Sequence, residues 1–115
     1  MRHEQLKKQL AELNETSSLK DIQDYVNEMI ATRGFADETL KDVMILLTEE
    51  LGELAKEVRK LSNMKLDPSK EKVADVEGEL ADIFIYLLSM CRLLKIDLFQ
   101  AFKNKEEKNS NRIWL

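Results

Sequence analysis

The chain has 115 residues, of which 43% are hydrophobic and 35% charged, with only three glycines and one proline. A sheet with many tight turns would need more glycine and proline. The composition therefore favours one all-α domain over residues 1–115. The net charge of −4 comes without a dominant basic run, and the longest apolar stretch, 83–88, is far shorter than the roughly 20 residues of a membrane-spanning helix. We therefore expect neither a nucleic-acid nor a membrane partner.

The single cysteine, Cys91, cannot form an internal disulfide and sits in an apolar run, which is typical of a buried thiol in a reducing, cytoplasmic protein. In chain order, the first segment, 1–16, is an extension with leucines at helical spacing but otherwise polar residues. It predicts a marginal helix that needs a partner surface. The catalytic bundle is expected over 18–112.

A second helix is predicted to begin at Ser17 or Ser18, because Ser18 and Asp21 match a capping box, and to end near Arg33 and Gly34. A third is predicted from an N-cap at Asp37 to about residue 61. Asp67 and the proline after it predict the start of a fourth helix, which runs to about residue 95. A final helix is predicted from residue 97 to about 109.

The third predicted helix has an apolar seam with steps of three and four residues, which is typical of packing at a shallow angle. The seam consists of Met44, Leu47, Leu51, Leu54, Val58 and Leu61. The second half of the fourth helix, 80–94, is apolar on nearly every side, so it is expected in the centre of a bundle or against a second subunit. These patterns predict an all-α bundle.

Two acidic motifs lie on the two longest predicted helices. Glu50 and Glu53 are three residues apart and share one helix face, as do Glu79 and Asp82. If the helices form an antiparallel hairpin around 62–69, the two pairs lie at similar distances from the turn, level to within about one helical turn. The four carboxylates can then converge.

Convergent carboxylates repel one another unless a cation neutralises them. The set contains only oxygen ligands, without a nearby histidine or thiol, which favours Mg²⁺, with Mn²⁺ as a possible substitute. For the first motif, a solvated helix face with salt bridges to Lys56 and Lys60 remains an equal alternative. The second motif is harder to explain in that way, because apolar residues flank Glu79 and Asp82.

A bundle that holds Mg²⁺ through carboxylates suits a polyphosphate substrate, because the cation neutralises phosphate charge. Several polar residues near the end of the chain would cluster on one side of the last helix and are candidate phosphate ligands: Lys105, Lys108, Asn109 and Arg112. Their alternative role is to complement the dipole at a helix C-terminus, which for this group taken alone is the simpler explanation.

Over about residues 19–114 the sequence resembles the MazG-like all-α nucleoside triphosphate pyrophosphohydrolases. The resemblance rests on an EExxE motif at 49–53, an ExxD motif at 79–82, Ile96-Asp97-Leu98 and a Lys-x-x-Lys-Asn-x-x-Arg tail. It implies an all-α, four-helix-bundle type of fold that is completed by oligomerisation as a homodimer or homotetramer. The implied activity is Mg²⁺-dependent hydrolysis of a nucleoside triphosphate between the α and β phosphates, as nucleotide-pool housekeeping. The aromatic that related dCTP pyrophosphatases carry after the first motif is replaced here by the charged segment 57–60, so cytosine specificity is not implied.

Carried over by position, the resemblance assigns the metal ligands to Glu50, Glu53, Glu79 and Asp82. Glu49 would orient or deprotonate the attacking water. Residues that would contact the substrate are Tyr86, Phe35, Lys105, Lys108, Asn109 and Arg112. For Tyr86, a purely structural place in the core is an equal alternative.

Two other functions fit the same pattern. One is a phosphoribosyl-ATP pyrophosphohydrolase, which keeps the bundle and changes the substrate. The other is a non-catalytic helical module that binds a nucleotide without turning it over. Product formation separates the enzymes from the binding module, and direct assay with phosphoribosyl-ATP separates the two enzymes.

Overall fold

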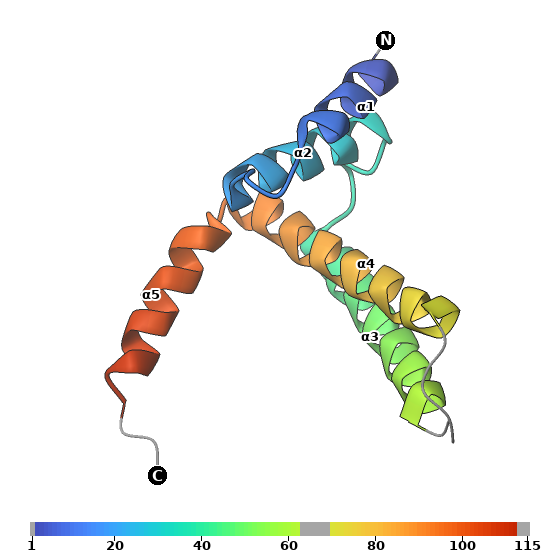
Figure 1. The fold of residues 1–115 in the computed structure, drawn as a ribbon. Coiled ribbons are helices and arrows are strands. Elements are labelled where there is room, and N and C mark those ends of the chain that lie inside the picture. Colours follow the sequence, from blue (N-terminus) through green and yellow to red (C-terminus); the bar gives the residue numbers. More distant parts are fainter. Residues whose placement is uncertain (1, 63–69, 113–115) are drawn as a thin grey trace. The chain divides into compact units, whose positions relative to one another are not determined.

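Five helices make up most of the part of the chain that the structure describes (Figure 1): α1 (Arg2–Glu12), α2 (Leu19–Thr32), α3 (Leu40–Ser62), α4 (Lys70–Leu94) and α5 (Leu98–Ser110). This computed structural model describes residues 2–62 and 70–112, and no strand occurs in these ranges. The all-α prediction is therefore confirmed. The predicted start of the fourth helix at Asp67 falls outside the described residues. No described helix combines the length and hydropathy needed to cross a membrane.

The chain divides into two compact units, one made of 1–37 and 91–115 and the other of 38–90. In the first unit α1 packs on α2. Its buried apolar side chains are Leu6, Val26, Met29, Ile30 and Cys91. The predicted marginal helix at the N-terminus therefore exists and has its partner surface on α2, and Cys91 is a buried, free thiol as predicted.

Both predicted ends of α2 are confirmed. Ser18 is the N-cap, since its hydroxyl accepts a hydrogen bond from the Asp21 N–H at 3.0 Å and the Asp21 carboxylate accepts from the Ser18 N–H at 3.1 Å. Two backbone donors that a helix start leaves unpaired are satisfied in this way. After the helix, Gly34 has a φ of 81°, a left-handed conformation that glycine adopts without steric cost.

The start of α3 differs from the prediction, in which Asp37 was the N-cap. The helix begins at Leu40, and Thr39 carries out the capping. The Thr39 hydroxyl accepts from the Asp42 N–H at 3.1 Å, while the Asp42 carboxylate accepts from the Thr39 N–H at 3.0 Å. This reciprocal pair satisfies two donors where a single aspartate satisfies one, and it holds the pKa of Asp42 below its ordinary value.

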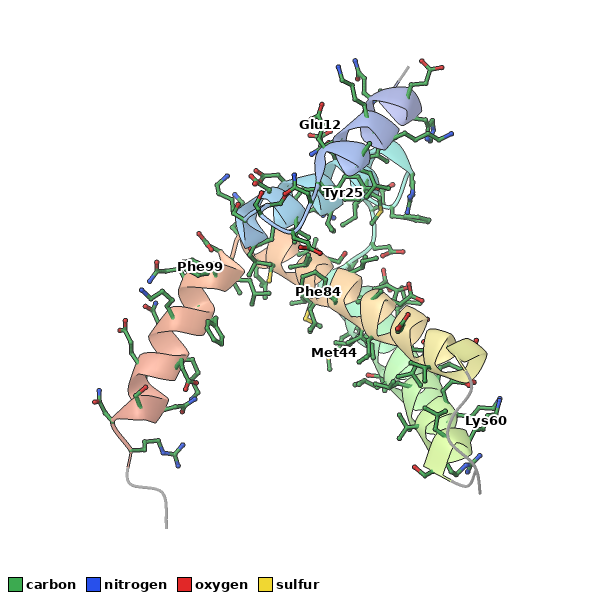
Figure 2. The ribbon with its side chains drawn as sticks, in the orientation of Figure 1. Glu12, Tyr25, Met44, Lys60, Phe84 and Phe99 are labelled. Atoms are coloured by element: carbon green, nitrogen blue, oxygen red, sulfur yellow. The ribbon has the colours of Figure 1, made fainter. Side chains whose placement is uncertain are left out.

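The second unit is an antiparallel helix pair, in which α3 and α4 lie side by side (Figure 1). Its buried apolar residues are Val43, Leu47 and Leu88. The seam predicted on α3 is only partly covered within the chain: Leu47 is buried, while Met44, Leu51 and Val58 are exposed. Figure 2 labels Met44 on α3 and Phe84 on α4, another apolar side chain that is exposed.

The capping pair at the start of α3 gives a direct test. Thr39→Ala should lower the free energy of unfolding by about 1 kcal/mol, because it removes the hydroxyl that accepts from the Asp42 N–H. Asp37→Ala, two residues earlier, should change it by less than about 0.5 kcal/mol. Urea unfolding of the two variants measures both values. A larger loss for Asp37→Ala than for Thr39→Ala would contradict the assignment.

Candidate metal-binding site

Three carboxylates meet between the two helices of the second unit. Glu50 projects from α3, and Glu79 and Asp82, three residues apart on one face, project from α4. One oxygen of each lies within 4.8 Å of one oxygen of each of the others. Glu50 and Glu79 are half-buried, whereas Asp82 is exposed. Three of the four carboxylates expected to converge therefore do so, and the cluster keeps one side open to solvent.

Glu79 is the member most strongly affected by its neighbours. A hydrogen bond with Glu50, burial, and the charges of Glu50, Asp82 and Glu53 together raise the pKa of the Glu79 carboxyl from 4.5 to about 7. The hydrogen bond comes first among these causes and requires one proton between Glu79 and Glu50, because two ionised carboxylates have no donor between them. In the absence of a cation, a proton thus takes part of the role of neutralising the cluster.

The Oε2 atom of Glu79 provides an independent test of whether a cation fits. This atom is buried, and no donor among the described residues reaches it. A buried polar atom without a partner is costly. A divalent cation bound by Glu50, Glu79 and Asp82 would bring positive charge to this carboxylate, and three oxygen donors are the ligand type that Mg²⁺ and Mn²⁺ prefer. The residues present therefore fit the predicted metal.

Glu53 and Glu49 lie on α3 beside this cluster, and both are exposed. Glu53 is not one of the three residues whose oxygens approach within 4.8 Å, but its charge contributes to the raised pKa of Glu79. The charge of Glu49 likewise contributes to the raised pKa of Tyr86. The alternative for the first motif was a solvated helix face with salt bridges. Such a face occurs after the motif on the same helix, where Glu57 forms a 3.3 Å ion pair with Lys60.

Tyr86, one helical turn beyond Asp82, is half-buried near the carboxylates. Burial is the largest cause that raises the pKa of its hydroxyl, and the charges of Glu50, Glu38, Asp82 and Glu49 add to it. A tyrosine hydroxyl is protonated at neutral pH in any protein environment of this kind, and these neighbours disfavour its ionisation further, so it can donate a hydrogen bond. Glu38 was not predicted here: it lies in the loop before α3, where no helical periodicity signals its proximity.

The other predicted substrate ligands belong to the first unit. Phe35 follows α2 and is exposed, while Lys105, Lys108 and Asn109 lie on α5 and Arg112 just after it. The Asn109 Nδ2 atom donates to the Glu106 Oε2 atom at 3.4 Å. The structure describes these residues with their own unit, so their contact with a substrate remains a prediction.

Comparison with known proteins gives two matches. Residues 38–113 match the MazG nucleotide pyrophosphohydrolase domain, a range that contains both acidic motifs and the tail cations. A protein of Salmonella phage PMBT28 named dATP/dGTP diphosphohydrolase is 31% identical over 99 residues. The match covers 86% of this chain but only 29% of the phage protein, so the chain corresponds to less than a third of that relative.

The raised pKa of Glu79 predicts that the metal-free protein loses stability as the pH rises. The folded state holds a proton up to about pH 7 that the unfolded chain releases near 4.5, so this contribution falls with pH between these two values. In EDTA, the melting temperature should therefore fall between pH 5 and pH 7 by more in the wild type than in Glu79→Gln.

Glu77→Gln is the matched control, since Glu77 is an exposed glutamate on the same helix. It should keep the pH dependence of the wild type. Equal pH dependence in the wild type and Glu79→Gln would contradict the electrostatic account of the cluster. Addition of Mn²⁺ at pH 7 should raise the melting temperature of the wild type and of Glu77→Gln, but not that of Glu79→Gln.

Proposed function

Because the chain belongs to the MazG nucleotide pyrophosphohydrolase family, we propose that it hydrolyses a nucleoside triphosphate between the α and β phosphates. Water adds to one phosphorus atom and the bridging bond breaks, which gives a nucleoside monophosphate and pyrophosphate. The observation that carries this proposal is the carboxylate cluster of Glu50, Glu79 and Asp82, with its buried Glu79 oxygen that lacks a donor. A cluster of this kind suits a cation-dependent reaction on a charged substrate.

Mg²⁺, with Mn²⁺ as a substitute, is the proposed cofactor. Glu50, Glu79 and Asp82 would hold it, and Glu53 on the same helix as Glu50 is the further candidate ligand. When bound, the cation supplies neutralisation of the phosphate oxygens and of the charge that develops on the leaving pyrophosphate. The pKa of Glu79 near 7 means that this carboxyl must release its proton to become a ligand, so protons and the cation compete at the cluster.

The protein's own residues then have separate roles. Glu49 is exposed at the edge of the site and is the proposed residue that orients or deprotonates the attacking water. Tyr86 is the proposed donor to the nucleotide, which the raised pKa of its hydroxyl supports, since it remains protonated among the carboxylates. The exposed Lys105, Lys108 and Arg112, with Asn109, are proposed to bind phosphate or sugar oxygens, and the exposed Phe35 to stack on the base.

The first substrates to test are dATP and dGTP, because the phage relative is named for them. The chain corresponds to less than a third of that protein, so this choice is a starting point for a screen rather than an assignment. We place the reaction in the cytoplasm, as housekeeping of the nucleotide pool. Phosphoribosyl-ATP belongs in the same screen as the alternative substrate.

We further propose that the domain acts as a homodimer or homotetramer. In the second unit, exposed apolar residues repeat every seven positions on both helices: Met44, Leu51 and Val58 on α3, and Val73, Leu80 and Leu87 on α4. A seven-residue repeat is typical of helices that pack along one seam. An isolated pair of helices buries little apolar surface, so the helix pair becomes more stable when a second copy covers this surface.

The geometry of the helix pair keeps this apolar surface away from the carboxylates. Leu51 follows Glu50 by one residue and Leu80 follows Glu79 by one residue, a rotation of about 100° in each case. Because the helices are antiparallel, these equal rotations lead to the same side of the pair. A second copy on that side would leave the opposite flank, where Asp82 is exposed, open to substrate.

The reaction is tested by pyrophosphate release in a screen of canonical and damaged nucleoside triphosphates and phosphoribosyl-ATP with Mg²⁺ or Mn²⁺. Asp82→Asn should lower kcat/KM at least about 100-fold on any substrate found, because loss of a direct metal ligand exceeds the effect of a supporting residue. Glu77→Gln, an exposed change of the same type on α4, should retain the wild-type rate.

Stabilisation by a nucleotide with Mg²⁺ but without any product would replace the proposal with a non-catalytic binding module. Turnover of phosphoribosyl-ATP alone would replace the substrate and keep the chemistry. An Asp82→Asn protein with wild-type activity would remove the carboxylate cluster from the reaction.

The oligomer is tested by analytical ultracentrifugation. The wild type should sediment as a dimer or tetramer, whereas Leu80→Glu should shift to the monomer, because it places a charge in the middle of the apolar surface. Lys56→Glu changes an exposed charge on α3 and should keep the wild-type mass. A monomeric wild type at micromolar concentration, or a Leu80→Glu protein of unchanged mass, would contradict the proposed interface.

A further inference from the structure

The turn between α4 and α5 is closed by hydrogen bonds at both of its ends. After Leu94, Lys95 has a positive φ of 55°, and the Ile96 N–H donates to the Cys91 carbonyl oxygen at 2.9 Å. This is the pattern that closes a helix with a left-handed residue. Asp97 then caps α5, since its Oδ1 atom accepts from the Gln100 N–H at 3.2 Å.

The side chain of Gln23, on α2, forms hydrogen bonds with the backbone of this turn. Its Nε2 atom donates to the Ile96 carbonyl oxygen at 3.0 Å, and its Oε1 atom accepts from the Leu98 N–H at 2.9 Å. Leu98 is the first residue of α5, so its N–H has no acceptor within the helix. One planar amide thus satisfies two backbone groups on either side of Asp97, across more than 70 residues of sequence.

Among the described residues, burial of side chains does little to fix α5. None of the thirteen residues of α5 is buried, and Phe99 and Phe102 are 52% and 62% exposed (Phe99 is labelled in Figure 2). A helix without a buried side chain gains little orientation from the hydrophobic effect. The direction in which α5 leaves α2 therefore depends strongly on the turn, and the turn is tied to α2 by Gln23.

We propose that Gln23 is a positioning residue for the substrate: through its two hydrogen bonds to the α4–α5 turn it sets the direction in which α5 presents its phosphate-binding residues. Those residues are Lys105, Lys108, Asn109 and, just after the helix, Arg112. The inference rests on the proposed pyrophosphohydrolase function. The metal-binding carboxylates lie in the other unit, so the cation should bind independently of Gln23.

Gln23→Met tests this, because methionine has a similar size and makes neither hydrogen bond. Amide exchange at Leu98 and along α5 should become about tenfold faster, the factor that two ordinary hydrogen bonds provide. Compared with the wild-type enzyme, Gln23→Met should have a KM for the triphosphate that is about tenfold higher and a kcat within about twofold. Mn²⁺ binding, measured by titration without nucleotide, should not change.

Two controls separate positioning from a general loss of stability. Gln5→Met makes the same chemical change at an exposed position on α1, and Ser18→Ala removes the cap of α2 and so weakens the same unit. Both should keep the wild-type KM. Gln23→Glu keeps an acceptor for the Leu98 N–H but replaces the donor to Ile96 with a carboxylate oxygen, so it should fold and raise KM by at least about threefold.

Faster exchange in α5 with an unchanged KM in Gln23→Met would overturn the proposal and leave Gln23 a purely structural role. An equal rise in KM for Ser18→Ala would overturn it as well, because any weakening of the unit would then suffice. A wild-type protein that releases no pyrophosphate from any triphosphate defeats the proposed function instead, and nucleotide binding by calorimetry then decides whether Gln23 positions α5 for binding alone.

Discussion

The charge balance of the second unit depends on the repulsion among three carboxylates on two helices. Glu50, Glu79 and Asp82 come within 4.8 Å of one another, and this arrangement is favourable only when positive charge enters the cluster. Without a metal, a proton shared between Glu79 and Glu50 neutralises part of the negative charge, and the pKa of Glu79 is accordingly raised to about 7. A divalent cation would neutralise the cluster more fully, since it also brings positive charge to the carboxylate of Glu79, whose buried oxygen no described donor reaches. Binding of the proposed metal would therefore also raise the stability of this helix pair.

The same helix pair separates charge from apolar surface by simple rotation. On each helix one carboxylate of the cluster is followed by an exposed leucine, Leu51 after Glu50 and Leu80 after Glu79. The apolar stripe therefore lies beside the site on both helices and does not intrude on it. A surface of this kind can bind a second copy while Asp82 remains accessible. The family match over 38–113 includes the whole helix pair, which agrees with its place at the centre of the proposed chemistry.

The local signals in the sequence differed in their value. The reciprocal pair of Ser18 and Asp21 identified the start of α2 correctly, and an equivalent pair, Thr39 and Asp42, was present at α3 but was missed in favour of Asp37. A lone aspartate is a weaker signal than two side chains that cap each other. The role of Gln23 could not be predicted from local signals, because its hydrogen-bond partners lie more than 70 residues away and no local pattern connects it with the α4–α5 turn.

The sequence by itself determined the all-α class, the helices and the convergence of the two acidic motifs, because helical periodicity and cap chemistry are local and the hairpin length sets which carboxylates are level. Only the tertiary structure decided that Glu50, Glu79 and Asp82 form the close cluster without Glu53, and that the charge of Glu38, in a loop, acts on Tyr86. It also showed that half of the apolar seam on α3 is left uncovered within the chain. Rotation of one helix against another and the path of a loop depend on contacts between distant residues, and periodicity along one helix carries no information about either.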